Sequence, residues 1–314
     1  MSGDDWGALL QNSGSTVEGG TIADADVSGA SEAPDLDGKV FVLGVGAQRS
    51  GTSWLHAYLA SHACVCMSEI KEMNYFNALW SETHRRYAYN MFTSELKRLE
   101  SGISRTGLRL PPEVATQGVR ALRDRVAIFA GGDGAYVDFF RRRVAPHHTH
   151  FGEITPAYSL LPVESFRHIR SLFANIKVVF VLRDPVQRVY SALRWRHGPK
   201  ADEALVAALS DPMIIERTRY DITIANLRAV FPAEALFFGF YETLFCDTSI
   251  QSLCEFLGLP FKTADYGQQV NASASQQRMS LTTGQIEAGR SAFAETYVFC
   301  RREFGDAVPA SWHG

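Results

Sequence analysis

The chain has 314 residues, of which 46% are hydrophobic and 21% are charged, and its formal net charge is −3 at pH 7. This length allows one large α/β domain or two small ones, and the composition allows an ordinary hydrophobic core. The slightly negative charge argues against nucleic-acid binding over the whole surface, so any anion site must be local.

No apolar run approaches the roughly 18 residues of a membrane span, so none is expected. The first 15 residues lack the basic and apolar segments of a secretory signal. The number of cysteines is odd, which argues against a disulfide framework and favours a reducing, cytoplasmic location. The five are Cys64, Cys66, Cys246, Cys254 and Cys300.

Residues 1–37 are rich in Ser, Gly, Ala and Asp and lack apolar periodicity, which is typical of a disordered tail. We expect a single domain over residues 38–314. Its first strand is predicted at residues 39–45, a short β-branched run, and its first helix at residues 52–60.

Further helical patterns and apolar runs alternate along the rest of the chain. Helices are predicted at residues 82–100, 112–144 with a break at 131–134, 213–230, 249–257 and 283–303, and another begins at Asp184-Pro185. Strands are predicted at residues 151–155, 176–182 and 235–240. This alternation predicts a three-layer α/β fold with a central parallel sheet flanked by helices.

A glycine-rich turn joins the first strand to the first helix. Its sequence, Gly46-Ala-Gln-Arg-Ser-Gly51-Thr-Ser53, has the glycine spacing of a Walker A loop. Glycines let backbone N–H groups curl around an anion, and the helix N-terminus adds a partial positive charge. The turn therefore predicts a phosphate site, with an ordinary strand-to-helix turn as the alternative.

The lysine of a Walker A loop is missing, because Thr52 stands in its place and the cation lies within the loop at Arg49. The strongest predicted strand is followed by Arg183 and not by an Asp that could hold Mg²⁺. Kinases of this loop type need both Lys and Mg²⁺. A small-molecule kinase is therefore the less favoured alternative, a non-catalytic nucleotide-binding protein is another, and no metal site is expected.

A second strand–helix junction supplies another set of anion ligands. Arg183 lies at the carboxyl end of the 176–182 strand, and Ser191 lies about two turns into the next helix. Ligands of open α/β sheets bind outside the carboxyl ends of strands, and Arg can hold a phosphate through two parallel hydrogen bonds. Two junctions suit a nucleotide phosphorylated at two positions.

Together these segments resemble the sulfotransferases that use 3′-phosphoadenosine 5′-phosphosulfate (PAPS). Residues 46–55 resemble the 5′-phosphosulfate loop and residues 182–191 resemble the 3′-phosphate motif. Residues 71–76, 152–158, 241–244 and 256–258 resemble further segments of bacterial and heparan-type members. The resemblance implies a P-loop-like fold and in-line, metal-independent transfer of a sulfuryl group to a hydroxyl or amine of a small molecule or glycan.

The resemblance also implies site residues. Those expected to bind PAPS are Gln48, Arg49, Ser50, Gly51, Thr52, Ser53, Trp54, Arg183, Ser191 and Arg278. Trp54 matches a residue that stacks on adenine in the cytosolic members, with a core position under the loop as the alternative.

Catalysis needs a cation on the leaving group and a base for the acceptor proton. We expect Arg49 to supply the first and Glu72 the second, with Tyr75 and Phe76 desolvating the carboxylate and raising its pKa. Glu153 is the reserve base. The less favoured candidates are His56, His62, His147, His148, His150 and His197.

Two positions depart from the heparan type, which has Lys where this chain has Ile154 and Asp where it has Asn77. These departures argue against a glycosaminoglycan acceptor. The sequence indicates neither the identity of the acceptor nor the oligomeric state.

Overall fold

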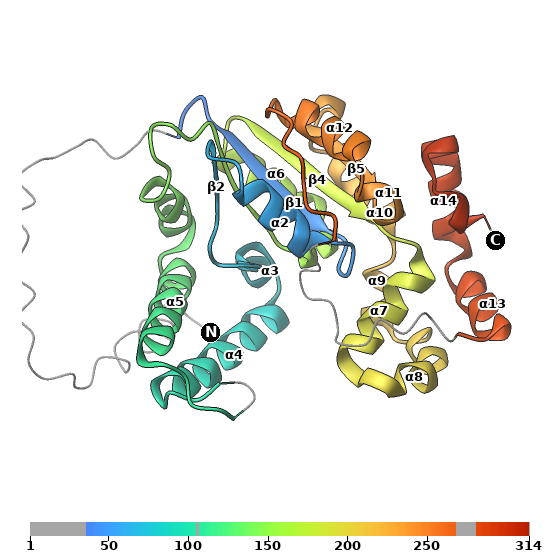
Figure 1. The fold of residues 1–314 in the computed structure, drawn as a ribbon, viewed down its shortest axis with the longest axis horizontal. Coiled ribbons are helices and arrows are strands. Elements are labelled where there is room, and N and C mark those ends of the chain that lie inside the picture. The colour runs from blue at the N-terminus through green and yellow to red at the C-terminus, as the bar shows by residue number, and fades with distance from the viewer. Residues whose placement is uncertain (1–35, 105–106, 268–280, 314) are drawn as a thin grey trace, which may run out of the picture.

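The computed structural model describes residues 36–104, 107–267 and 281–313. Its centre is a five-stranded, fully parallel sheet with the strand order β2-β3-β1-β4-β5 (Figure 1). The strands are β1 (Val40–Gly46), β2 (Val65–Met67), β3 (His150–Ile154), β4 (Ile176–Leu182) and β5 (Leu236–Phe240). The predicted fold class is confirmed. Nearly all of the predicted tail lies outside the described residues.

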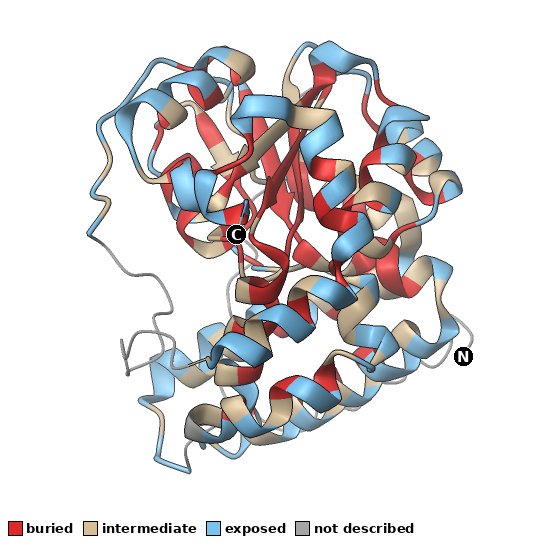
Figure 2. Ribbon diagram, turned by 90° about the vertical axis from the view of Figure 1, so that its right-hand side faces the viewer, coloured by how far each residue is buried: buried red, intermediate tan, exposed pale blue. Residues whose placement is uncertain are grey.

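Both faces of the sheet are covered, as the buried strands between outer helices in Figure 2 show. Successive side chains of a strand point to opposite faces. On β4, Val179 and Val181 belong to one hydrophobic cluster, whereas Val178 and Phe180 belong to the other. Because both faces of this strand are buried, nearly all of its residues are apolar, which explains the continuous apolar run seen in the sequence.

Two helices supply most of the cover on the first face. They are α2 (Thr52–Ala60) and α12 (Asp247–Leu257), and both contribute buried residues to the cluster that contains Val179. The C-cap of α12 is Gly258 with φ of 72°, a left-handed conformation that glycine adopts without strain.

The opposite face carries the larger cluster. The helices that contribute to it include α6 (Val163–Leu172), α7 (Pro185–His197), α8 (Ala201–Ala208), α10 (Tyr220–Arg228) and α14 (Ala294–Phe304). As predicted, Asp184 is the N-cap of α7, where its side chain accepts a hydrogen bond from the Gln187 N–H at 2.9 Å.

Three helices lie between β2 and β3 in the chain. They are α3 (Tyr75–Trp80), α4 (Glu82–Glu100) and α5 (Pro112–Arg141), and α4 and α5 enclose a small core of their own that includes Phe92 and Val126. The α5 axis is kinked at Gly132, where φ is 66°, within the predicted break. Neither these helices nor any other in the described ranges has the length and apolar character needed to cross a bilayer.

Two predicted helices are each divided. Residues 213–230 hold α9 (Pro212–Glu216) and α10, because the buried Arg188 of α7 binds the Ile214 carbonyl and the Thr218 hydroxyl and so fixes a turn between them. Residues 283–303 hold α13 (Thr283–Ala292) and α14, which meet at the buried Phe293. In both places a tertiary contact overrides a continuous helical pattern.

Candidate functional site

The sheet topology brings the two predicted phosphate junctions together. β1 and β4 are neighbouring parallel strands, so the turn after Gly46 and the turn after Leu182 leave the sheet at the same edge. β1 also pairs with β3 on its other side, and connections therefore diverge at this point. Such switch points are the usual ligand sites of open parallel sheets.

The phosphate loop reaches the start of α2 through two left-handed residues. Arg49 has φ of 71° and Gly51, the N-cap of α2, has φ of 78°. A Cβ at Gly51 would lie 3.1 Å from Phe245 Cζ and 3.3 Å from Tyr241 Cδ2, so glycine is needed for space as well as for conformation.

The start of α2 has the properties of an anion site. Gly51 provides no side-chain cap for the first N–H groups of the helix. The Ser50 side chain is fully buried, and its hydroxyl has no hydrogen-bond partner among the described residues. An anion oxygen would satisfy both the hydroxyl and the N–H groups. The neighbouring Thr52 is also buried, and Gln48 is partly exposed.

Arg49, Ser191 and Arg183 are in direct contact across the two junctions. The Arg49 Nε donates to Ser191 Oγ at 3.2 Å, and the Arg183 Nη1 donates to the Arg49 carbonyl at 2.6 Å. Burial and the neighbouring Arg183 charge lower the pKa of Arg49. Because the Arg183 charge disfavours the charged form of Arg49, an anion bound near both residues would be favoured.

Tyr241 contacts Arg183. The Arg183 guanidinium lies 4.2 Å from the centroid of the Tyr241 ring, a cation–π geometry, while its Nε is buried without a partner in the described part of the chain. The sequence placed Tyr241 in a family-like segment but gave it no role.

Lys71 and Glu72 lie beside the start of α2. The Lys71 Nζ donates to Ser53 Oγ at 2.5 Å and lies 3.6 Å from Glu72 Oε1. Tyr75 and Phe76 pack into the large core instead, and the Glu72 side chain is 43% exposed. The expected desolvation of Glu72 by these two rings is therefore not found, and its role as base stays a prediction.

Glu153 is fully buried and surrounded by hydroxyl donors. It accepts hydrogen bonds from Tyr136 Oη at 2.6 Å, Thr155 Oγ1 at 2.6 Å and Tyr158 Oη at 2.9 Å. Burial raises its pKa, and the hydrogen bonds act in the opposite direction. A carboxylate held in this way is suited to joining β3 to α5 and the following turn.

Trp54 lies among aromatic side chains on the α2 face of the sheet. Its ring stacks on Tyr58 and Tyr266, with centroid separations of 5.4 and 5.9 Å, and its Nε1 donates to the Asp265 carbonyl at 3.3 Å. These contacts suit the core alternative, and stacking on adenine stays a prediction. Arg278 lies outside the described residues.

Several histidines make structural hydrogen bonds. His56 Nε2 lies 2.8 Å from the Ser68 carbonyl, and His150 Nε2 lies 2.7 Å from the Leu257 carbonyl. Burial lowers the pKa of both rings. At the two positions that depart from the heparan type, Ile154 packs in the sheet core and Asn77 donates to the Ala157 carbonyl at 3.0 Å.

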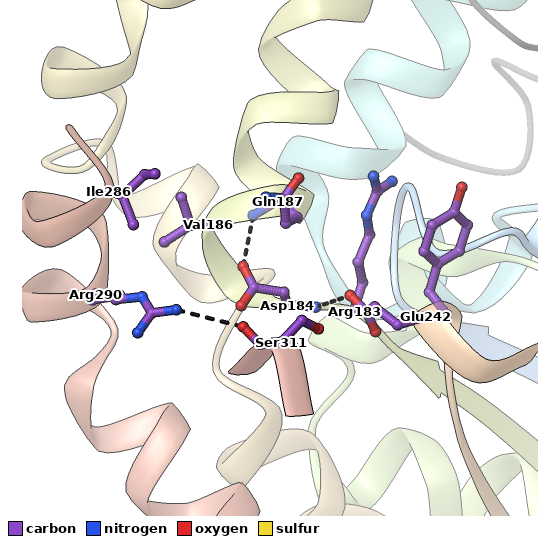
Figure 3. A pocket seen from close by; sticks show the side chains of 9 residues that line it. Arg183, Asp184, Val186, Gln187, Glu242, Ile286, Arg290 and Ser311 are labelled. Carbon is purple, nitrogen blue, oxygen red and sulfur yellow. Dashed lines mark hydrogen bonds between the residues drawn. The ribbon is translucent and has the colours of Figure 1, made fainter. Parts of the chain in front are cut away.

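A cavity of about 310 Å³ adjoins Arg183 on the side of the C-terminal helices (Figure 3). Its lining residues are Arg183, Asp184, Val186, Gln187, Tyr241, Glu242, Ile286, Arg290 and Ser311. Of the predicted site residues that the structure describes, only Arg183 lines it, so the cavity adjoins the phosphate loop through Arg183 and includes no residue of the loop. Within the described ranges no group of three His, Cys, Asp or Glu side chains could hold a metal ion.

The chain belongs to the sulfotransferase family, because the model of that family matches residues 40–263. The match includes both phosphate junctions and the segment with Lys71 and Glu72. A search of curated protein sequences finds no match.

The fold is similar to that of a solved sulfotransferase, and two sulfotransferase domains align less closely. A sulfotransferase from Alicyclobacillus acidocaldarius aligns with a TM-score of 0.58 and 17% identity over 88% of this chain and 99% of that one. The sulfotransferase domain of the Synechococcus PCC 7002 olefin synthase aligns with a TM-score of 0.45 and 18% identity over 84% and 98% of the two chains. A sulfotransferase domain from the curacin biosynthetic pathway gives 0.44 and 17% over 74% and 80%.

Proposed function

We propose that the protein transfers the sulfuryl group of PAPS to a hydroxyl or amine of a small-molecule or glycan acceptor, without a metal ion. The contact network of Arg49, Ser191 and Arg183 carries the proposal, because it joins the loop expected to hold the 5′-phosphosulfate to the motif expected to hold the 3′-phosphate. One ligand with anions at both ends would bind to both junctions.

The donor site has groups suited to such a ligand. The uncapped start of α2 and the buried Ser50 hydroxyl would bind the 5′ group. Arg183 and Ser191 would bind the 3′-phosphate, since charge-assisted hydrogen bonds from Arg are the stronger ones. The 3.2 Å bond between Arg49 and Ser191 would then be exchanged for bonds to the ligand.

Transfer of the sulfuryl group needs a proton acceptor and a stabilised leaving group. The acceptor oxygen would attack sulfur as the bond from sulfur to the bridging phosphate oxygen breaks. Glu72 would take the acceptor proton, while Arg49 and the N–H groups of the loop would neutralise the charge that develops on the leaving phosphate. The products would be the sulfated acceptor and 3′-phosphoadenosine 5′-phosphate (PAP).

We also propose that the protein is located in the cytoplasm. All five cysteines are free thiols, which is consistent with a reducing cytoplasm.

The test is turnover with ³⁵S-labelled PAPS in the presence of EDTA. Each product of a hydroxyl and amine acceptor panel would be identified by mass spectrometry. The proposal expects label on an acceptor and equimolar PAP. Label transfer that stops with EDTA and returns with Mg²⁺, or phosphoryl transfer from ATP to the same acceptor, would favour the kinase alternative.

A further inference from the structure

Three non-glycine residues in the described ranges have a left-handed backbone. They are Arg49, Glu72 and Asn74, with φ of 71°, 59° and 56°. Asn tolerates this conformation because its short polar side chain can bond to the nearby backbone, whereas the conformation is unfavourable for Glu and Arg. Such backbones persist only where surrounding contacts fix them, and they cluster at functional sites. Two of the three, Arg49 and Glu72, are the residues proposed to assist the transfer.

Hydrogen bonds fix the backbone on both sides of the Glu72 side chain. The Asn74 Nδ2 donates to the Glu72 carbonyl at 2.8 Å, and the Arg125 Nη2 of α5 donates to the Lys71 carbonyl at 3.2 Å. Met73, between the two left-handed residues, is buried in the large core. The segment therefore turns Met73 inward, while the Glu72 side chain stays 43% exposed.

Asn74 begins α3 but does not cap it with its side chain. An Asn at this position usually accepts a hydrogen bond from one of the first N–H groups of the helix. Here the side chain makes no cap hydrogen bond, and its amide donates to the Glu72 carbonyl instead. The Asn74 amide therefore holds residue 72 and does not serve to start the helix.

Asn74 is itself joined to the buried hydrogen-bond network of Glu153. The Asn74 backbone N–H donates to Thr155 Oγ1 at 3.4 Å, and Thr155 Oγ1 donates to Glu153 Oε2 at 2.6 Å. Because the one hydroxyl proton of Thr155 goes to Glu153, its oxygen is left to accept from Asn74. Thr155 and Glu153 are both fully buried, so this end of the network belongs to the core.

The other end of the network lies at the phosphate loop, where the Lys71 Nζ contacts both Ser53 Oγ and the Glu72 carboxylate. We infer that Asn74 is a positioning residue, because it holds Glu72 in the left-handed conformation that keeps its carboxylate beside Lys71 and the start of α2. Without the amide, residue 72 would relax to an ordinary backbone conformation and its carboxylate would move. The inference rests on the proposed function, since it explains how the proposed base is held.

The first experiment measures the backbone preference of residue 72 through stability and needs no acceptor. Glycine adopts a left-handed backbone without strain, but at ordinary positions it is less stabilising than alanine. Glu72→Gly should therefore have a Tm about 2 °C or more above that of Glu72→Ala. The same pair is then compared in an Asn74→Gly background, in which residue 74 can stay left-handed but lacks the amide. There the advantage of glycine at position 72 should disappear.

The second experiment tests whether Asn74 acts through Glu72. Asn74→Gly should lower the single-turnover rate of ³⁵S transfer by about tenfold or more, a part of what a general base contributes, while the affinity for PAP changes by less than about threefold. In a Glu72→Gln background the same substitution should change the rate by less than about threefold, because the group that Asn74 positions is already absent.

Asn226→Ala is the matched control. The Asn226 Nδ2 on α10 also donates to a backbone carbonyl, that of Leu161, at 3.1 Å. Loss of this amide should leave the rate of transfer unchanged whatever its effect on Tm. If Asn74→Gly does not fold, Asn74→Asp takes its place in both experiments, since it keeps the shape and the tolerance for a left-handed backbone but lacks the donor.

An advantage of glycine over alanine at position 72 that survives in the Asn74→Gly background overturns the inference, and so does the absence of that advantage in the wild-type background. Equal rate losses from Asn74→Gly with Glu72 and with Gln at position 72 also overturn it, because Asn74 would then act by another route. Absence of PAP binding would instead contradict the proposed function, and the stability comparison would still decide whether Asn74 holds residue 72.

Discussion

The Arg49 Nε donates a hydrogen bond to Ser191 Oγ at 3.2 Å across 142 residues of sequence. Arg49 leaves the sheet after β1 and Ser191 lies on the helix that follows β4. The contact joins the two strand–helix junctions.

Arg49→Met should lower turnover by about 10²–10³-fold, because it removes a cation from the charge that develops on the leaving group. Arg49→Lys keeps the charge and should retain more of the activity. Ser191→Ala removes one hydrogen bond that an uncharged hydroxyl would donate to the 3′-phosphate, and it should weaken PAP binding by about tenfold or less. Single-turnover kinetics and calorimetry measure the two effects. An Arg49→Met enzyme as fast as wild type would exclude the leaving-group role.

Arg183→Ala should weaken PAP binding by about tenfold or more, because a hydrogen bond to a charged group contributes about 1.5–3 kcal/mol. The fold should persist, since the side chain is partly exposed and, among the described residues, its hydrogen bond is to the Arg49 carbonyl. Calorimetry gives the affinity, and Arg196→Ala at an exposed position on α7 is the control. Unchanged affinity in a folded Arg183→Ala protein would remove Arg183 from the site.

Glu72→Gln should lower the chemical step by about 10²–10⁴-fold, because it deletes a proton acceptor and preserves size. PAP affinity and Tm should hardly change, since the side chain is 43% exposed. Single-turnover kinetics with an acceptor from the panel measures the step.

Glu153→Gln tests whether Glu153, and not Glu72, acts as the base. The substitution alters a buried carboxylate that accepts hydrogen bonds from three hydroxyl groups, so it should lower the free energy of unfolding by about 1–3 kcal/mol. If the Glu72→Gln enzyme stays within about threefold of wild type while a folded Glu153→Gln enzyme is inactive, the role of base belongs to Glu153.

Acidification should reduce stability through His150. Burial lowers its pKa, so between the lowered value and the ordinary value of 6.5 the unfolded chain binds more protons than the folded one. The stability is present above pH 6.5 and is lost as the pH falls through the folded-state pKa. Urea unfolding at pH 7.5 and 5.5 should show a smaller loss for His150→Gln than for wild type. An equal loss in both proteins would contradict this assignment.

The sequence predicted the elements whose signal is local. The apolar run of β4 and the Asp184-Pro185 start of α7 lie where expected. A buried strand and a helix cap each depend on residues that are adjacent in the sequence, so both can be predicted from it. The three-residue β2 was not predicted, since it is too short to show a period. The division between α9 and α10 depends on the distant Arg188, which no local pattern reveals.

In the candidate site too, features that depend on local sequence were predicted, and features that depend on tertiary contacts were not. The loop and Arg183 were found because they belong to motifs at the ends of strands, and their contact follows from the strand order. Arg125 was not found, because its contact with the Lys71 carbonyl forms only after α5 packs beside that segment. The aromatic neighbours of Glu72 in sequence suggested desolvation, but their side chains turn into the core.

The most direct test of the central claim, that this site holds a PAPS-type nucleotide, is a comparison of PAP and ATP–Mg²⁺ by calorimetry and thermal unfolding. Binding to the native state alone adds about 2.7 kcal/mol at 100 times the Kd, so saturating PAP should raise Tm by several degrees. The account predicts tight binding of PAP without metal and weak binding of ATP–Mg²⁺. Strong stabilisation by ATP–Mg²⁺ with none by PAP would contradict it.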